Sequence, residues 1–255
     1  LDYFEDIWAL DTNREFRANG EAGRVLRAAA ALRERWAAIT GAGRVTPIDW
    51  DAETIQAGGV TVLHGDCAAR NKEPVLLNTL TALMQGGREQ VVVQTPYIIC
   101  NRAMYDALEK AVGAAQVQII TNAPQRGANP WGCADYLNQK KAILSTGASV
   151  CEWHGERSMH TKTILIDGRF SIIGSFNWDM RSAYLDTELM LLVDCPELNA
   201  ALRAEADEMV RQGRLLLPDG TAVEGAAYTA PEMPPYKKIL QPVLRVVIRP
   251  FRYVL

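Results

Sequence analysis

The sequence contains no apolar run near the ~20 residues that a membrane-spanning helix needs, and no stretch with the pattern of a secretory signal peptide. These absences exclude a hydrophobic span within the 255 residues and say nothing about a longer parent protein. Because the first residue is Leu1 and not methionine, we expect the chain to be a piece of a longer protein.

An excess of positive charge is also missing. The chain carries a formal net charge of −3, so it has no overall basic field that would attract nucleic acid. Hydrophobic residues make up 48% and charged residues 22% of the sequence, as in ordinary globular proteins. The length allows one large or two small domains.

Cysteine pairs with metal-binding or redox spacing are absent. The five cysteines lie at positions 67, 100, 133, 151 and 195, and no two of them form a C-x-x-C pair. This odd number and wide spacing argue against a disulfide framework and against a zinc knuckle. We therefore expect reduced thiols that are buried in the structure.

The hydrophobic pattern predicts an α/β fold. Helical spacing occurs in residues 1–40, 76–84, 101–112, 134–146 and 196–210, and short strand-like runs occur at 60–63, 90–95, 117–121, 149–153, 161–167, 170–174 and 188–194. The Asp167-Gly168 pair between two runs predicts a tight antiparallel hairpin. We predict a mixed β-sheet flanked by helices on both faces. A helical segment and linker at 1–58 precede this domain at 59–213, and a basic, apolar tail at 214–255 follows it.

Residues 236–255 contain cations interleaved with apolar side chains and no acidic residue; the cations are Lys237, Lys238, Arg245, Arg249 and Arg252. Because the whole chain carries −3, the residues outside this segment carry −8. The composition fits an amphipathic segment on an anionic membrane surface. It equally fits a strand or helix that packs on the domain with its arginines pointing outward. Pro242 and Pro250 argue against one continuous helix.

The stretch MHTKTILIDGRFSIIGSFNWDMRS, residues 159–182, carries the strongest chemical pattern. Side chains alternate between the two faces of a strand, so His160 and Lys162 project to the same side. Asp167 lies seven residues from His160, which puts it on the opposite side or in the turn. There it is expected to open the Asp-Gly turn and accept hydrogen bonds from backbone amides.

Ser175 and Asn177 follow the second strand of the predicted hairpin, which can bring them beside His160 and Lys162. This set of groups suits a phosphate: Lys162 supplies a cation, and the serine and asparagine supply neutral donors to its oxygens. The histidine can attack phosphorus or protonate a leaving oxygen. No second carboxylate or histidine is placed to form a metal site, so we expect no metal and no cofactor.

Glu188 opens an otherwise apolar strand, where an unpaired carboxylate would be costly. We expect it to accept a hydrogen bond from His160 and so fix the tautomer of that ring. The alternative is a salt bridge to Arg181 or another cation.

His160-x-Lys162-x4-Asp167, followed by Gly174-Ser175-x-Asn177, resembles the HKD signature of the phospholipase D superfamily. The similarity covers residues 59–213 well, and the longer pattern looks most like the bacterial cardiolipin synthase-type members of the superfamily. The segment ending in Tyr97 resembles the family's "PY" element, which makes Tyr97 a candidate substrate-binding residue. Glu188 matches the family's downstream acidic position.

The resemblance implies a phospholipase D-like α-β-α fold in which two HKD motifs meet at one active site. In that family one histidine becomes phosphorylated, the other protonates the leaving group, and no metal is needed. His160, Lys162, Asp167 and Glu188 are then the candidate catalytic residues, and Ser175, Asn177 and Tyr97 the candidate substrate-binding residues.

The motif occurs once. His64 has no lysine two residues on, and His154 is followed by Gly155-Glu156, so both are expected to be structural or solvated. Three arrangements remain open: a second motif upstream, residues 1–58 being the end of a preceding phospholipase D-like half; a homodimer that shares one site, as in single-motif nucleases; or an inactive binding domain.

The resemblance implies phosphatidyl transfer or phosphodiester hydrolysis on a phosphatidylglycerol-like phospholipid through a phosphohistidine. The acidic domain and the basic, apolar tail favour a lipid over nucleic acid as substrate. We expect a membrane surface as partner and an association with the bacterial inner membrane on its cytoplasmic face.

Overall fold

The computed structural model describes residues 2–11, 13–14, 22–41, 48–67, 72–230 and 232–255. The chain divides into two units, Leu1–Gln56 and Ala57–Leu255. The first contains α1 (Asp2–Trp8), α2 (Ala22–Gly41) and the short α3 (Trp50–Glu53). The predicted helices are confirmed for α1 and α2, whereas 15–21 and 42–47 lie outside the described residues. α3 falls in the predicted linker, where Asp49 caps it by accepting from Ala52 N.

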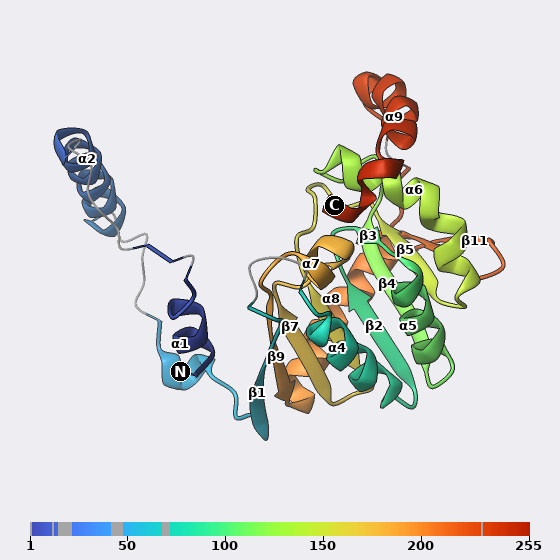
Figure 1. Ribbon diagram of the computed structural model, residues 1–255, viewed down its shortest axis with the longest axis horizontal. Helices are drawn as coiled ribbons and strands as arrows, with labels where there is room; N and C mark the ends of the chain where they lie inside the picture. The colour runs from blue at the N-terminus through green and yellow to red at the C-terminus, as the bar shows by residue number, and fades with distance from the viewer. Residues whose placement is uncertain (1, 12, 15–21, 42–47, 68–71, 231) are drawn as a thin grey trace. The chain divides into compact units, whose positions relative to one another are not determined.

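The second unit is built on one mixed sheet with the strand order β1-β9-β7-β6-β2-β4-β5-β10-β11 among the described residues (Figure 1). The strands are β1 (Gly59–His64), β2 (Gln90–Gln94), β4 (Gln116–Asn122), β5 (Ser149–Trp153), β6 (Thr163–Ile166), β7 (Phe170–Gly174), β9 (Leu189–Asp194), β10 (Arg214–Leu216) and β11 (Ala222–Glu224). β2, β4 and β5 run parallel, and the other pairings are antiparallel. A two-stranded ribbon pairs β3 (Ile98–Ile99) with β8 (Trp178–Asp179). β10 and β11, which the sequence did not predict, extend the sheet past residue 213.

Helices cover both faces of the sheet, as predicted. The helices of this unit are α4 (Val75–Gln85), α5 (Arg102–Val112), α6 (Pro130–Ser145), α7 (Met180–Tyr184), α8 (Pro196–Gln212), α9 (Pro235–Val247) and the 3-10 helix η1 (Arg249–Val254). None of the described helices is long and apolar enough to cross a membrane.

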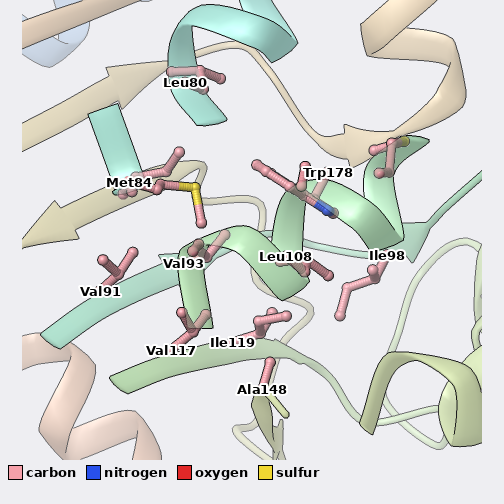
Figure 2. Packing of buried hydrophobic residues seen from close by; sticks show 14 of the residues in the cluster. Leu80, Met84, Val91, Val93, Ile98, Leu108, Val117, Ile119, Ala148 and Trp178 are labelled. Carbon is pink, nitrogen blue, oxygen red and sulfur yellow. The ribbon is translucent and has the colours of Figure 1, made fainter. Parts of the chain in front are cut away.

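Strand β2 shows why two helical layers form. Val91 and Val93 project to the face that holds Leu80 of α4 and Leu108 of α5, where they join the larger core (Figure 2). Val92 projects to the other face and packs in a second cluster with Ala206 of α8. Because both faces of this strand are buried, its sequence is continuously apolar and does not alternate.

The cysteines meet the expectation from their spacing. All five are free thiols, and Cys100, Cys133, Cys151 and Cys195 are buried, while Cys67 is half-buried. Burial raises the pKa of the Cys133 thiol to about 11 and that of Cys151 to about 12, so both stay protonated near neutral pH.

The predicted hairpin joins β6 to β7 in antiparallel register, with Asp167 in the left-handed conformation at φ 50°. Its carboxylate accepts hydrogen bonds from the backbone N–H groups of Arg88, Glu89 and Gln90 at 2.9–3.2 Å. Burial alone raises the pKa of Asp167, but these donors outweigh burial and lower it. Asp167 therefore ties the hairpin to the start of β2.

Candidate active site

The HKD segment lies at the edge of the sheet where β2, β4 and β5 end. β6 runs antiparallel to β2, so it begins at this edge, and His160 stands just before it. Asn122, the last residue of β4, holds the preceding residue: its amide donates to Met159 O at 2.9 Å and accepts from Met159 N at 2.8 Å. The end of a buried strand thus fixes the backbone next to the histidine.

His160 and Lys162 lie together, although the strand predicted at 161–167 begins only at Thr163, so both residues precede β6. The Lys162 ammonium donates to the backbone carbonyl of His160 at 2.9 Å and lies 3.1 Å from Nδ1 and 3.3 Å from Nε2 of the ring. His160 is exposed, whereas Lys162 is only 8% exposed. The imidazole is therefore open to a ligand, with a partly desolvated cation beside it.

Two buried acids balance the charge of Lys162. Burial lowers the pKa of the ammonium, and the charges of Glu188 and Asp179 act in the opposite direction. Glu188 is 6% and Asp179 is 1% exposed. Burial outweighs the two acids, so the pKa of Lys162 is lowered overall, and the ammonium bonds to the backbone carbonyl of His160 and not to either carboxylate.

The expected partners of Glu188 were wrong. Its Oε1 accepts from the hydroxyl of Ser182 at 2.6 Å, and neither His160 nor Arg181 bonds to it. Arg181 instead pairs with Asp186 at 2.9 Å. Ser182 lies on α7. Glu188 thus bonds to this serine, and its charge raises the pKa of Lys162.

Asp179 is a site residue that the sequence reasoning missed. Its Oδ1 accepts from Ser182 N at 2.7 Å, so one serine joins two buried carboxylates. Burial, and then the charge of Glu188, raises the pKa of Asp179 to about 6, although bonds from Ser182 oppose the rise. Ser175, Asn177 and Asp179 occupy every second position. Extending the every-second-residue pattern by one step beyond Asn177 would therefore have identified Asp179 from the sequence.

Ser175 lies beside the site, but its hydroxyl bonds elsewhere. Gly174 N donates to Lys162 O at 3.3 Å, which brings the end of β7 next to the HKD segment. The Ser175 hydroxyl donates to Leu189 O at 3.2 Å and accepts from Leu189 N at 3.0 Å. To donate to a phosphate it would have to give up the bond to Leu189 O, because a hydroxyl has one hydrogen.

Glycine at 174 is required by this close approach. A Cβ there would lie 2.2 Å from Leu189 O, so a larger residue would push β7 away from β9. The glycine of the motif therefore serves strand packing.

Asn177 and Tyr97 are the other two candidate substrate-binding residues, and the Tyr97 hydroxyl has a side-chain hydrogen bond with Asn129. Asn177 Oδ1 is buried and has no hydrogen-bond partner within the described part of the chain. Tyr97 is half-buried; burial, and then the charge of Asp179, raises the pKa of its hydroxyl, which therefore remains a neutral donor. That these two residues bind substrate stays a prediction.

Asp167 stands apart from these groups. The four residues of β6 separate it from Lys162, and its carboxylate is taken up by the amides at the start of β2. The place of Asp167 fits a positioning residue that fixes the hairpin, and not one that meets the phosphate. This differs from the catalytic role that the resemblance implied.

The two other histidines lie outside the HKD arrangement. His154 is half-buried and meets the Tyr228 ring edge-on at 5.0 Å, and burial lowers its pKa. A ring nitrogen of His64 lies 3.0 Å from Gly65 O. Among the described residues no group of three histidine, cysteine or acidic side chains could hold a metal ion.

The sequence that carries this histidine, lysine and buried acids matches a known family. The family model described as "Cardiolipin synthase, PLD-like domain" matches residues 80–210, about half of the chain. The chain belongs to this phospholipase D-like family. The matched residues include the HKD segment, Tyr97 and Glu188.

Curated relatives of this phospholipase D-like chain include cardiolipin synthase A from Salmonella arizonae and from Salmonella enteritidis. Each is 27% identical over 198 residues, covering 69% of this chain and 39% of the relative. The chain thus spans about two fifths of the length of these relatives.

Two solved structures share the fold. Nuc, a phospholipase D family member from Salmonella typhimurium, matches with a TM-score of 0.50 and 17% identity over 61% of this chain and 97% of Nuc. The phosphatidylserine synthase of Haemophilus influenzae matches with a TM-score of 0.54 and 18% identity over 77% of this chain and 48% of that protein. These similarities establish the phospholipase D-like α/β fold.

Proposed function

We propose that the chain supplies one of two HKD half-sites of a phospholipase D-type enzyme that transfers or hydrolyses phosphatidyl groups through a phosphohistidine. The observation that carries the proposal is the pair formed by the exposed His160 ring and the Lys162 ammonium within 3.3 Å of it. Membership of the cardiolipin synthase PLD-like family supports the same chemistry.

The reaction has two balanced steps. A histidine nitrogen attacks phosphorus, the bond from phosphorus to the head-group oxygen breaks, and the histidine of the facing motif gives its proton to that oxygen. The oxygen of an alcohol or of water then attacks phosphorus and the phosphorus–nitrogen bond breaks. The facing histidine takes up the proton of the attacking oxygen. His160 takes one of the two roles, and Lys162 stabilises the negative charge on the phosphoryl oxygens in both steps.

A lipid is the favoured substrate class. The residues outside 236–255 carry −8, which disfavours a groove for nucleic acid. A phosphatidylglycerol-like donor would pass its phosphatidyl group to another lipid head group or to water, at a bacterial membrane surface. Head-group release from phosphatidylglycerol by the full-length protein tests this; DNA hydrolysis with no lipid turnover would overturn the substrate class.

The second half-site comes from upstream sequence or from a second copy of the chain. Because the chain spans 39% of the length of the curated relatives, there is room for another motif in a longer protein. A homodimer would bring two copies of His160 together by symmetry. If a homodimer supplies the second half-site, activity per chain should rise with protein concentration. If upstream sequence supplies it, activity per chain should not depend on protein concentration.

Glu188→Gln tests whether the negative charge of Glu188 keeps Lys162 protonated. The Glu188 charge raises the pKa of Lys162 against the effect of burial, so removing it lets the ammonium lose its proton at lower pH. We expect the alkaline limb of the kcat/KM profile for phosphatidylglycerol to move to lower pH, with a loss of about tenfold near neutral pH.

The matched control is Glu208→Gln, which removes an equal charge from an exposed pair with Arg211. We expect this variant to leave both the rate and the profile unchanged. An unaltered alkaline limb in Glu188→Gln would remove Glu188 from the site.

A further inference from the structure

The C-terminal segment has two opposite faces, and only one of them packs on the domain. Leu244 and Ile248 of this segment are buried, at 5% and 2% exposure. The Lys237 ammonium donates to Gln125 O and Gly127 O at 3.0 Å and 2.9 Å. Arg245 and Asn138 of α6 exchange two hydrogen bonds at 2.8 Å and 3.0 Å. These contacts fix the side of α9 that faces α6.

The other face of α9 is an apolar stripe with nothing on it among the described residues. Tyr236, Ile239, Val243 and Val246 recur at spacings of three, four and three, so they line one side of the helix. Their exposed fractions are 62%, 76%, 56% and 68%. We call these four residues the apolar stripe of α9. The sequence left open whether the tail lies on a membrane surface or packs on the domain. In the structure one face of α9 packs on the domain, and the opposite face is exposed.

Cations flank the stripe. Lys238 and Arg249 are exposed, and neither has an ion pair or a side-chain hydrogen bond within the described part of the chain. The segment 236–255 contains no acidic residue, while the rest of the chain carries −8. The segment is therefore suited to a partner surface that carries negative charge. A symmetric pairing of two stripes would bring like charges together.

The segment also lies beside the active site. Its first turn holds the loop 125–127 through Lys237, and that loop follows Asn122, which clamps the residue before His160. Its last residue, Leu255, accepts from Arg181 N at 3.0 Å, next to Ser182. Figure 1 shows α9 in red, projecting beside α6 from the body of residues 57–255. The segment therefore packs at the same end of the sheet as His160, where β4 ends at Asn122.

We propose that the apolar stripe of α9, with Lys238 and Arg249, docks on an anionic phospholipid surface and brings the edge carrying His160 to the lipid. Exposed apolar residues enter the boundary between head groups and acyl chains, while cations at the rim interact with anionic head groups. The inference deepens the proposed function by naming the face that meets the lipid. Binding by this face does not depend on catalysis, so the two can fail separately.

The test is co-sedimentation of the chain with phosphatidylcholine vesicles that contain or lack phosphatidylglycerol. Ile239→Asp combined with Val246→Asp puts two charges into the stripe, at positions exposed enough to leave the fold intact. We expect at least about tenfold weaker binding to the anionic vesicles. Lys238→Gln and Arg249→Gln should each weaken that binding about fivefold and reduce its salt dependence.

The matched control is Val25→Asp combined with Leu32→Asp on α2. Both of these residues are exposed, at 64%, and they have the same seven-residue spacing. The control should bind like the wild type. His160→Asn should also bind like the wild type. The stripe substitutions made in the full-length protein should leave its turnover of a water-soluble phosphodiester unchanged, which separates docking from catalysis.

Three results would overturn the proposal. The first is wild-type binding to the anionic vesicles by the stripe variant, and the second is equal binding of the wild type to neutral vesicles. The third is a concentration-dependent dimer that the stripe substitutions dissociate while vesicle binding is absent, which would assign the stripe to a second copy of the chain.

Discussion

His160→Asn in the full-length protein is expected to lower head-group release from phosphatidylglycerol by at least about 10³-fold without unfolding the domain. An amide can neither attack phosphorus nor exchange a proton near neutral pH, and each role of a catalytic histidine accounts for factors of this size. Because His160 is exposed, thermal stability should stay close to that of the wild type.

His64→Asn provides the matched control for this substitution. It makes the same chemical change at an exposed histidine that has no lysine two residues on. We expect it to leave the rate within a factor of about three. Wild-type turnover by a folded His160→Asn protein would refute the assignment of the site.

A phosphodiester with a p-nitrophenol leaving group then separates the two roles of His160. This leaving group needs no proton, so its release by His160→Asn should survive if His160 is the acid, and should be lost if His160 is the nucleophile. Measuring both substrates on one preparation gives the role directly.

Arg252→Met is expected to have the largest effect on stability. Arg252 forms a two-bond pair with Asp135 of α6, at 2.8 Å and 2.9 Å, and the aspartate is fully buried. Removing the guanidinium leaves a buried carboxylate whose charge is uncompensated. Such losses cost about 3–5 kcal/mol, and because the arginine is partly exposed we expect about 3 kcal/mol in the free energy of unfolding.

Urea denaturation measures this change, and two variants control it. Arg249→Met removes an exposed cation three residues away, so it should change stability by less than about 0.5 kcal/mol. Asp135→Asn added to Arg252→Met removes the buried charge and should recover most of the loss. A wild-type midpoint for Arg252→Met would show that this pair does not hold the C-terminal segment.

The parts of the fold that follow from local periodicity could be predicted from the sequence. The Asp-Gly pair gave the hairpin between β6 and β7. Strand alternation placed His160 and Lys162 on one side; the two do lie together, but both precede β6. The Val-rich run at 90–95 predicted a strand, which β2 confirms, and the two core clusters confirm the predicted helices on both faces of the sheet.

Contacts that no regular spacing fixes could not be predicted in this way. Glu188 bonds to Ser182, six residues earlier, across the irregular segment between α7 and β9. The carboxylate of Asp167 meets amides that lie 77 to 79 residues away in the sequence. The resemblance to a family supplied the identity of the acidic position but not its partner.

The claim that one HKD motif makes only half of a site is tested most directly by the turnover of the 255-residue chain alone, as a function of its concentration. The mass of the chain in solution is measured at the same concentrations. The account predicts no head-group release from phosphatidylglycerol by the monomer, and release only by the full-length protein or in proportion to a dimer. A monomer that turns over the lipid at the rate of the full-length protein would contradict it.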